Sequence, residues 1–494
     1  MSIFRIENRL YSAAQNRELD RIAIEDFAIP GYELMQAAGY AVYEQISPQA
    51  RSVAIVCGEG NNGGDGFVIG RLLLEANRSV TLILIGKQEN IQGDALLACS
   101  DFLAAGGIIE KDISLIDNHD TIIDAIFGTG LCRQVTDLHL QAIVKINAAS
   151  ATVIAVDVPS GCDATCGKIY GAAVYADITV SFIGNKSGLF TGSGKECCGR
   201  LIYRPLQVPQ RVHTLPPYAL SVFQEQIREY LPNRNRDSHK GDFGNILIIG
   251  GNYGMAGAAI LCALGALRSG AGLVTIATRK EHVNAIFAAH PEIMTHAVES
   301  AAQLQPLIDK ADVIVCGCGL GQDDWAREMF ALTISTDKQL ILDADALNQL
   351  AQAPTVLKES TIITPHPGEA ARLLNCNTQE IQQNRYNSCR ELSKKYGAIT
   401  ILKGAGTIIS SALFSDIFNA EFLVLNNGNP GMATAGMGDL LSGIIAGLCG
   451  QTDELYKAAI AAAWIHSEAA DIAAKGGSAG MIASDLLPQI RKLI

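Results

Sequence analysis

Short apolar runs rich in β-branched residues alternate along most of the chain with longer stretches whose apolar residues follow a helical period. Continuous apolar runs of this length are typical of strands buried on both faces, and segments such as residues 66–76 are typical of helices. We expect strands in the first half at residues 53–56, 80–85, 121–126, 152–156 and 178–182. In the second half we expect them at residues 246–249, 273–277, 313–316, 340–342, 361–363 and 398–402.

This strand-then-helix alternation predicts an α/β fold with mainly parallel sheets covered by helices on both faces. The alternation stops between Arg204 and Asp237, where RPLQVPQRVHTLPPY, a short helical stretch at residues 221–230 and LPNRNRDSHKGDFG follow one another. Prolines and mixed charges of this kind mark a linker. We therefore predict two domains, residues 1–220 and residues 221–494.

Composition narrows the class of protein. The 494 residues leave room for two or three domains, and the formal charge of −12 disfavours a nucleic-acid partner. The most apolar window, residues 255–277, is interrupted by Arg268, so we interpret it as a buried helix and a strand and expect no membrane association. The 13 cysteines are scattered, which favours reduced thiols in a cytoplasmic protein. We also expect a homo-oligomer.

The loop after the first strand contains G-x-G-x-x-G at Gly58, Gly60 and Gly63. A dinucleotide fingerprint also needs an acidic residue at the end of the second strand, where this chain has Gly86 and Lys87. The fingerprint is therefore incomplete.

The same loop is unusually polar and rich in glycine. Glycines allow a ligand to approach the backbone, amide side chains donate and accept hydrogen bonds, and the following helix offers free N–H groups. The alternative is a tight strand-to-helix turn. We favour a binding loop formed by Asn61, Asn62, Gly63, Gly64 and Asp65.

Polar residues also follow three later strands of the first half. Asp124 precedes a second glycine-broken loop, Asp157 begins DVPSGCD, and GNKSG spans Gly184 to Gly188. Carboxylate and amide groups at neighbouring strand ends suit a hard cation or an acid/base pair. A single aspartate at a strand end can instead be a helix cap.

NNGGDG, FGTGL and DVPSG, in this order and spacing, resemble the epimerase domain of the NAD(P)H-hydrate repair enzymes. The resemblance implies a Rossmann-like domain that interconverts the R and S forms of NADH and NADPH hydrated at C6 of the nicotinamide ring. It implies that Asn62, Asp124 and Ser160 hold K⁺ and that Asp157 contacts substrate. Asp157 is our candidate acid/base, with Lys186 as a weaker one. The implied substrate-binding residues are Asn61 to Asp65 above together with Gly128, Thr129, Gly130, Leu131, Cys132, Arg133 and Gln134.

The second half carries two glycine-rich segments of its own, ILKGAGT after a strand and NPGMATAGMGDLLSGIIAG at the start of an apolar helix. Backbone N–H groups at this helix terminus would stabilise a phosphoryl group in transit. Asp439, expected one residue into the helix, is placed to accept a proton from an attacking hydroxyl, or is a partner of the helix dipole. No G-x4-G-K-[ST] motif occurs, so a P-loop is excluded.

This G-x-G-D turn and KGAGT resemble the ribokinase-like superfamily. HKGDFGNILIIGGNYGMAGAA, CGLG, LDADALN and TPHPGEAARLL resemble the hydrate dehydratase of the same repair pathway more specifically. The family pattern usually has threonine where this chain has Met437; the backbone N–H remains, so we expect the anion site to survive without a hydroxyl contact.

The resemblance implies Ala256, Gly319, His366 and Asp439 at the hydrated nicotinamide nucleotide. It implies an adenine nucleotide, ADP or ATP with Mg²⁺, at Lys403, Gly404, Ala405, Gly406, Thr407 and Gly438. Phosphorylation of the C6 oxygen would turn a poor leaving group into a good one, and elimination would restore NAD(P)H. His366 has a second interpretation, a neutral histidine capping the helix that begins at Pro367.

Other functions fit parts of the pattern. The second half is also compatible with a vitamin-precursor or sugar kinase that releases a phosphorylated alcohol. The first half is compatible with a non-catalytic nucleotide-binding or partner-binding module, and an ordinary dehydrogenase is a third alternative.

Overall fold

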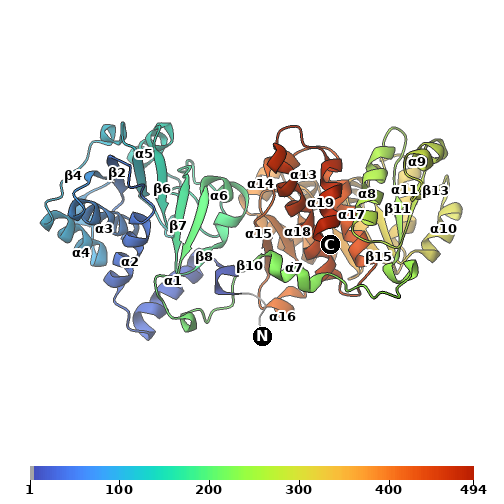
Figure 1. Cartoon of the computed structure of the whole chain (residues 1–494), viewed down its shortest axis with the longest axis horizontal. Coiled ribbons are helices and arrows are strands. Elements are labelled where there is room, and N and C mark those ends of the chain that lie inside the picture. The colour runs from blue at the N-terminus through green and yellow to red at the C-terminus, as the bar shows by residue number, and fades with distance from the viewer. Residues whose placement is uncertain (1–4) are drawn as a thin grey trace. The chain divides into compact units, whose positions relative to one another are not determined.

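The computed structural model describes residues 5–494, and the chain folds into two compact units (Figure 1). The first unit ends at Leu220 and the second begins at Ser221, so the division falls inside strand β10 (Ala219–Val222). The helix predicted at residues 221–230 is wrong at its start, because Ser221 and Val222 belong to β10 and helix α7 spans Gln224–Tyr230.

A parallel sheet in the order β4-β3-β2-β5-β6-β7-β9 forms the centre of the first unit. Chain connections run from β2 toward β3 and β4 on one side and toward β5 on the other, so the sheet has a switch point between β2 and β5. The strands are β2 (Ser52–Cys57), β3 (Ser79–Leu84), β4 (Ile109–Glu110), β5 (Thr121–Ala125), β6 (Thr152–Val156), β7 (Ile178–Phe182) and β9 (Arg200–Arg204).

Both faces of this sheet are covered, which explains why its strands are apolar at every position. In β2, Val53, Ile55 and Cys57 pack with helices α2, α3 and α4, whereas Ala54 and Val56 pack with α5 on the opposite face. The helices are α2 (Gly31–Tyr43), α3 (Asn61–Glu75), α4 (Gly93–Ala104), α5 (Asp137–Ala148) and α6 (Gly192–Cys197).

A small ribbon attaches the N-terminal segment to the first unit. Strand β1 (Arg9–Tyr11) pairs antiparallel with β10 and parallel with β8 (Asn185–Lys186), so that Tyr11 lies opposite Lys186. Helix α1 (Ala13–Arg21) follows directly and is capped by the Ser12 hydroxyl, which accepts a hydrogen bond from the Gln15 N–H at 3.2 Å. This ribbon decides where α1 lies.

In the second unit the strands run in the order β13-β12-β11-β14-β15-β16-β17-β18-β19, with a switch point between β11 and β14. β11 to β17 are parallel, and β18 and β19 are antiparallel to their neighbours. The strands are β11 (Asn245–Ile249), β12 (Leu273–Thr278), β13 (Met294–Ala297), β14 (Val313–Cys316), β15 (Gln339–Leu342), β16 (Thr361–Ile363), β17 (Ile399–Leu402), β18 (Thr407–Ser410) and β19 (Phe422–Leu425).

Helix α17 (Met437–Cys449) is buried almost all round and packs closely on α8 (Ala256–Arg268). A side chain at Gly443 would place its Cβ 1.9 Å from the Cys262 carbonyl oxygen, so glycine is required at that crossing. The other helices are α9 (Val283–Ala289), α10 (Ala301–Lys310), α11 (Asp324–Ile334), α12 (Ala344–Gln352), α13 (Pro367–Leu374), α14 (Thr378–Gln383), α15 (Arg385–Tyr396), α16 (Phe414–Phe418), α18 (Leu455–Ala473) and α19 (Leu487–Leu493).

The predicted α/β class, with mainly parallel sheets and helices on both faces, is confirmed, and each predicted strand is present to within a residue or so at its ends. The short strands β1, β8 and β10, the edge strands β4, β9 and β13, and the hairpin strands β18 and β19 were not predicted. β1, β4 and β8 are two or three residues long, and β4, β9 and β13 lie near an edge of a sheet, so these strands give a weak pattern. β10, β18 and β19 are buried and as long as several strands that were predicted, and no pattern explains why they were missed.

The lengths of the helices and the state of the cysteines can also be compared with the sequence-based expectations. Within residues 5–494, none of the helices is both long enough and apolar enough to cross a membrane. All thirteen cysteines carry free thiols, and most of these are buried.

Candidate active sites

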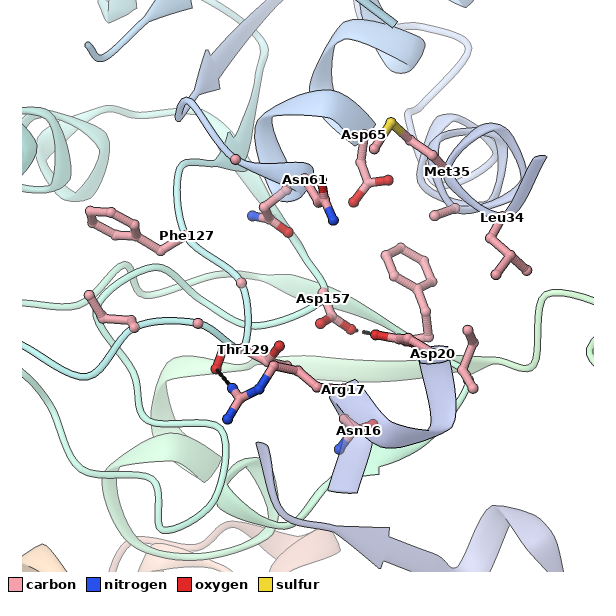
Figure 2. A pocket seen from close by; sticks show the side chains of 18 of the residues that line it. Asn16, Arg17, Asp20, Leu34, Met35, Asn61, Asp65, Phe127, Thr129 and Asp157 are labelled. Carbon is pink, nitrogen blue, oxygen red and sulfur yellow. Dashed lines mark hydrogen bonds between the residues drawn. The ribbon is translucent and has the colours of Figure 1, made fainter. Parts of the chain in front are cut away.

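A cavity of about 770 Å³ opens at the switch point of the first sheet. The loop after β2 and the start of α3 form one wall, the loop after β5 forms a second, and α1 with α2 forms a third (Figure 2). The carboxyl ends of β6 and β7 contribute Asp157 and Phe182. This is where open parallel sheets generally bind ligands.

The NNGGDG segment is helical and is not the loop that we predicted, because α3 begins at Asn61 with Gly60 as its N-cap. Asn61, Asn62 and Asp65 line the cavity from the first turn of the helix. The predicted Gly63 and Gly64 lie outside the lining. A Cβ at Gly63 would lie 1.9 Å from the Gly58 carbonyl oxygen, so this glycine is required for packing of the helix against the strand end.

Residues 128–133 of the second predicted loop line the cavity, whereas Gln134 lies outside the lining. Arg17 of α1 donates a hydrogen bond to the Thr129 carbonyl oxygen at 3.2 Å, which ties this loop to the N-terminal helix (Figure 2). Beside it, Phe127 stacks on His139 with ring centroids 4.9 Å apart. These two contacts hold the loop in place at the wall of the cavity.

Asp157 is held by Phe182, the last residue of β7, and by Lys186 of β8. Its carboxylate is ion-paired with the Lys186 ammonium and accepts a hydrogen bond from the Phe182 N–H at 3.2 Å. Lys186 is buried and also donates to the Phe182 carbonyl oxygen at 2.8 Å. Asp157 has a φ of +65°, a left-handed conformation that costs a non-glycine residue free energy and is found most often at functional sites.

Asp124 and Ser160 lie buried beneath the cavity wall. The Ser160 hydroxyl donates to the Asp124 carboxylate at 2.5 Å, and the Ser160 N–H donates to it at 2.7 Å. Burial raises the pKa of Asp124 to about 6, and hydrogen bonds from Ser160 and Ile126 oppose that shift. Asn62 is buried in the cavity wall, and its Nδ2 has no partner.

These three residues fit a monovalent cation. Carboxylate, hydroxyl and amide oxygens are the ligands of hard cations, and a positive ion beside Asp124 would offset the cost of burying its charge. Among the described residues 5–494, no group of three or more His, Cys, Asp or Glu side chains has the arrangement of a metal site. The set formed by Asn62, Asp124 and Ser160 differs from such a group, because only Asp124 among them is one of these residue types.

A second cavity, of about 500 Å³, lies at the carboxyl ends of β15, β16 and β17 in the second unit. Lys403 donates to the Asp343 carboxylate at 2.8 Å, and its ammonium lies 3.8 Å from Glu369. The nearby positive charge of Lys403 and hydrogen bonds from Lys403, Thr364 and Ser442 lower the pKa of Asp343 despite its burial. Burial raises the pKa of Glu369 to about 7.

Asp439 lies in the same cavity, in the first turn of α17. The helix begins at Met437 after Gly436, whose φ is +89°, so Asp439 is its third residue and not its first as predicted. Burial and then the charge of Asp343 raise the pKa of Asp439, while a hydrogen bond from Cys318 and the charge of Lys403 oppose the shift. Met437 is buried and points away from solvent.

His366 has the predicted capping role, and its contact with the nucleotide stays a prediction. Its Nδ1 accepts hydrogen bonds from the N–H groups of Gly368 at 3.0 Å and Glu369 at 3.4 Å, so it is the N-cap of α13 with Pro367 at the first position. The same side chain lines the second cavity. Burial lowers the pKa of His366, and the nearby Lys403 lowers it further, which keeps the imidazole neutral as a cap requires.

The KGAGT segment is a turn between β17 and β18, anchored from behind by Arg385. This guanidinium is fully buried and donates to the carbonyl oxygens of Leu402 at 3.2 Å and Lys403 at 3.1 Å. Lys403, Gly404 and Gly438 line the cavity; the other predicted residues of the turn, Ala405, Gly406 and Thr407, lie outside the lining.

Ala256 and Gly319 also lie outside this lining, at the switch point between β11 and β14. The Asn252 N–H donates to the Gly319 carbonyl oxygen at 2.7 Å, and a Cβ at Gly319 would lie 2.6 Å from the Met255 oxygen. Gly319 follows Cys318, which is near enough to Asp439 to lower its pKa. The two loops are therefore in contact and are linked to the second cavity through Cys318.

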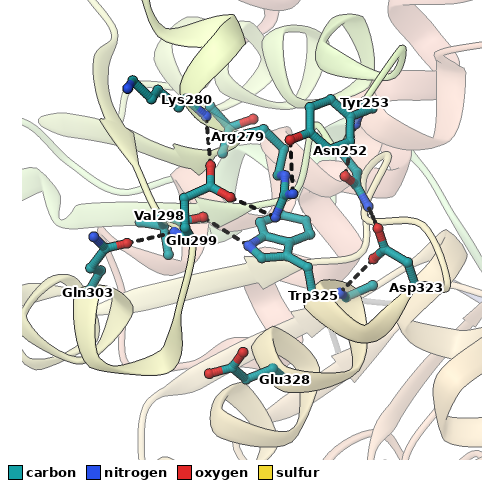
Figure 3. A network of polar contacts seen from close by, with 12 residues as sticks. Asn252, Tyr253, Arg279, Lys280, Val298, Glu299, Gln303, Asp323, Trp325 and Glu328 are labelled. Carbon is teal, nitrogen blue, oxygen red and sulfur yellow. Dashed lines mark hydrogen bonds and ion pairs between the residues drawn. The ribbon is translucent and has the colours of Figure 1, made fainter.

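A polar network supports the loop that leads to Ala256 (Figure 3). Arg279 pairs with Glu299 at 2.9 Å, donates to the Tyr253 hydroxyl at 3.0 Å and lies over the rings of Tyr253 and Trp325. The Asn252 amide donates to Asp323, the N-cap of α11, at 3.0 Å. These contacts hold Tyr253 at the mouth of the switch point, where its side chain is about half exposed.

Comparison with known proteins supports one family for the whole chain. The family model described as NAD(P)H-hydrate dehydratase matches residues 246–492, and that described as YjeF-related protein N-terminus matches residues 31–188. The chain is 42% identical to the bifunctional NAD(P)H-hydrate repair enzyme Nnr of Coxiella burnetii (strain RSA 493 / Nine Mile phase I), over 98% of this chain and 99% of that protein. The chain belongs to the bifunctional NAD(P)H-hydrate repair enzymes.

Further similarities agree with this membership. The repair enzyme Nnr of Escherichia coli (strain K12) is 38% identical over 99% of this chain and 94% of its own length. The crystal structure of a ribokinase-like superfamily protein from Enterococcus faecalis V583 is 31% identical and superposes with a TM-score of 0.51 on 55% of this chain and 94% of its own. The expected ribokinase-like fold of the second unit is confirmed.

Sequence reasoning missed several residues that this repair-enzyme fold brings into the two cavities. In the first they include Asn16, Arg17 and Asp20 of α1, and in the second Asp343 and Glu369. The quoted segments LDADALN and TPHPGEAARLL contain the last two, so their position after a strand was a usable signal. The residues of α1 precede the first strand of the sheet, and no strand-end argument reaches them.

Proposed function

We propose that the chain repairs hydrated NADH and NADPH, with an epimerase site in the first unit and an ADP- or ATP-dependent dehydratase site in the second. The observation that carries this proposal is that each unit of a chain of this family has a separate cavity at the carboxyl edge of its sheet, with an acid/base carboxylate facing it. Asp157 is that carboxylate in the first cavity and Asp439 in the second.

In the first cavity, Asp157 accepts and returns protons at the C6 oxygen of the hydrated ring. Lys186 forms an ion pair with the Asp157 carboxylate, and the contact of Lys186 with the Phe182 carbonyl oxygen fixes the direction of this pair. The residues from Asn61 to Asp65 and residues 128–134 bind the remainder of the nucleotide. Asn62, Asp124 and Ser160 would hold K⁺, which would supply a fixed positive charge beneath the site.

In the second cavity, the N–H groups at the start of α17 surround the phosphoryl group that moves to the C6 oxygen. Asp439 accepts the proton of the attacking hydroxyl, and Lys403 offsets the charge of the phosphates. Asp343 and Glu369 place carboxylates in the same cavity, which suits Mg²⁺, an ion usually held by one or two carboxylates together with substrate phosphates. Bound Mg²⁺ would offset phosphate charge.

Ala256, Gly319 and His366 are proposed to contact the hydrated nicotinamide nucleotide, and residues 403–407 with Gly438 the adenine nucleotide. The effect of Cys318 on the pKa of Asp439 supports the first assignment, because it places the loop of Gly319 near that aspartate. Lys403, Gly404 and Gly438 in the cavity lining support the second. A homo-oligomer and a cytoplasmic location stay predictions, and we propose ADP as the physiological donor.

One experiment tests the function directly. The purified chain is incubated with an equilibrated mixture of R and S hydrated NADH and Mg²⁺, with ADP or ATP in parallel, and the dihydronicotinamide absorbance is followed. We expect complete recovery with the intact chain and none with Asp439→Asn. Accumulation of a phosphorylated product without recovery of NADH would instead identify a small-alcohol kinase.

A further inference from the structure

Helix α1 brings a third charged group to the pair formed by Asp157 and Lys186. The pairing of β1 with β8 places Tyr11 opposite Lys186, and α1 starts two residues later. Asn16, Arg17 and Asp20 line the cavity from α1. Residues four apart lie on one face of a helix, so Asn16 and Asp20 enter the cavity together.

The carboxyl groups of Asp20 and Asp157 point toward one another in the cavity (Figure 2). Asp20 is exposed to the cavity, and desolvation by the surrounding protein raises its pKa to about 6. The positive charge of Lys186 opposes the rise and the negative charge of Asp157 adds to it. Asp65 of α3 completes the cluster, and burial followed by the charges of Asp157 and Asp20 raises its pKa also.

Asp157, Asp20 and Asp65 are the three carboxyl groups of this cluster. Its one ammonium group belongs to Lys186 and is in direct contact with Asp157. Like charges at short range cannot all be ionised, so protons are retained on the members that lack a cationic partner. Asp157 is the member that has the cationic partner, through its ion pair with Lys186. Arg17, on the same helix as Asp20, donates to the Thr129 carbonyl oxygen. Asp20 and Asp65 both line the cavity and can hold a proton, and Asp20 is the one whose carboxyl group points toward that of Asp157.

We propose that Asp20 is a catalytic residue of the epimerase site, acting as general acid in a carboxyl pair with Asp157 that shares one proton. The inference rests on the proposed epimerase function and assigns a residue that a single acid/base at Asp157 does not include. It also gives the N-terminal helix a chemical role besides closing the cavity.

The proposed step begins with proton transfer to the leaving group. Asp20 gives its proton to the C6 hydroxyl, the C6–O bond breaks, and the lone pair of the ring nitrogen forms a C=N⁺ bond to C6, so that water leaves and C6 becomes planar. A water molecule then adds to C6 from either face, a new C–O bond forms, the electron pair returns to nitrogen, and Asp157 takes the proton of that water. Transfer of this proton from Asp157 to Asp20 restores the pair.

The test uses the full chain and a single separated epimer. R-hydrated NADH is supplied without ADP or ATP, its conversion to the S form is measured by chromatography, and spontaneous epimerisation is subtracted. Dehydration of the S form by the same preparation shows that the second unit is folded, and thermal unfolding of the full chain shows whether the first unit is folded as well. We expect Asp20→Asn to lower kcat for epimerisation by about 10²- to 10⁴-fold, the usual contribution of a general acid, with the dehydration rate unchanged.

Two further variants serve as references. Asp26 is an exposed carboxylate that does not line the cavity. Asp26→Asn makes the same chemical change there, and we expect it to epimerise at the rate of the intact chain. Asp20→Glu retains a carboxyl group and recovers part of the activity. An Asp20→Asn protein that epimerises as fast as Asp26→Asn, or that changes KM alone, overturns the proposal.

The pH dependence of kcat/KM and the uptake of ¹⁸O from solvent distinguish a general acid from a residue that only supports the structure. A general acid must be protonated, so kcat/KM of the intact chain falls as pH rises through the upper apparent pKa of the pair, and this limb is absent from the residual activity of Asp20→Asn.

In H₂¹⁸O each epimerisation places one solvent oxygen at C6; retention of the original oxygen overturns the proposal. An intact chain that leaves the R form unchanged refutes the epimerase function, and the role of Asp20 falls with it.

Discussion

Asp439 and Asp343 both lie near the Lys403 ammonium group, yet their pKa values are shifted in opposite directions. Asp343 has the direct contact with Lys403 and further hydrogen bonds, so its pKa is lowered, whereas burial and the charge of Asp343 raise the pKa of Asp439. Such a separation assigns different roles to two neighbouring carboxylates. Asp343 remains ionised as a fixed charge, and Asp439 can exchange a proton during turnover.

This difference predicts the pH dependence of dehydration. A general base must be ionised, so kcat should fall as pH falls through the pKa of Asp439, which lies above the ordinary carboxyl value of about 4. Asp343→Asn removes the charge that raises this pKa and should move the acid limb of the profile to lower pH. The exposed Asp337→Asn is the control. An acid limb at the same pH in all three proteins would contradict the assignment.

At the scale of elements, the three glycines of the G-x-G-x-x-G motif, Gly58, Gly60 and Gly63, differ in why glycine is found there. A Cβ at Gly58 would lie 2.1 Å from the Ile126 oxygen and one at Gly63 would lie 1.9 Å from the Gly58 oxygen, whereas a Cβ at Gly60 would have no atom within 4 Å. Gly58 and Gly63 let β2, β5 and α3 approach one another. A motif that resembles a dinucleotide fingerprint is thus required here by the packing of three backbone segments.

We predict from these distances that Gly63→Ala and Gly58→Ala destabilise the first unit by about 1–3 kcal/mol or more, the usual range for overpacking, because backbone must move. Gly60→Ala is the matched control and should leave stability unchanged. Thermal unfolding of the full chain measures the effect, and dehydration of the S epimer reports whether the second unit stays folded. Equal stability of all three variants would refute this explanation.

The turn between β17 and β18 depends in the same way on one buried side chain. Arg385→Met removes the donors to the Leu402 and Lys403 carbonyl oxygens, and a buried unpaired acceptor costs about 1–3 kcal/mol. We predict a lower melting temperature and a roughly 10-fold higher KM for the nucleotide, since 1.4 kcal/mol is a factor of ten. Arg390 lies on the same helix as Arg385 and forms an ion pair with Glu421. Arg390→Met removes this pair and should change neither the melting temperature nor the KM. Similar results for both variants would show that the turn needs no anchor.

For the whole molecule, the two cavities belong to different units, and each is lined by residues of its own unit only. The epimerase and dehydratase steps therefore have separate sets of residues that can be inactivated one at a time. A chain with both sites can clear both epimers although dehydration acts on the S form alone.

We predict that this division of labour works through free exchange of substrate. Asp157→Asn should repair only the S form, apart from spontaneous epimerisation, and Asp439→Asn should epimerise without repair. An equimolar mixture of the two variants should clear both epimers at the rate of the intact chain at equal concentration of active sites. A mixture markedly slower than the intact chain would show that substrate passes between sites within one molecule.

Local pattern was sufficient for much of this protein. Apolar runs located the buried strands, because a strand covered on both faces has no polar positions, and their alternation with helices specified parallel sheets. Asp157, Lys403 and His366 lie after strands, so the rule that ligands bind at the carboxyl edge led to them, and the motifs carried the family. The start of α3 at Asn61 was missed because glycines disfavour helix unless packing requires them.

Tertiary structure alone decided the remainder. Asp20 meets Asp157 and Lys186 because β1 pairs with β8 and carries α1 to the cavity, and a pairing between such short strands leaves no period in the sequence. Glu369 and Asp439 acquire raised pKa values from burial and from neighbours distant along the chain. The sequence by itself determined which residues can do chemistry and where strands end; only folding brought distant charges close enough to set which carboxyl groups hold a proton.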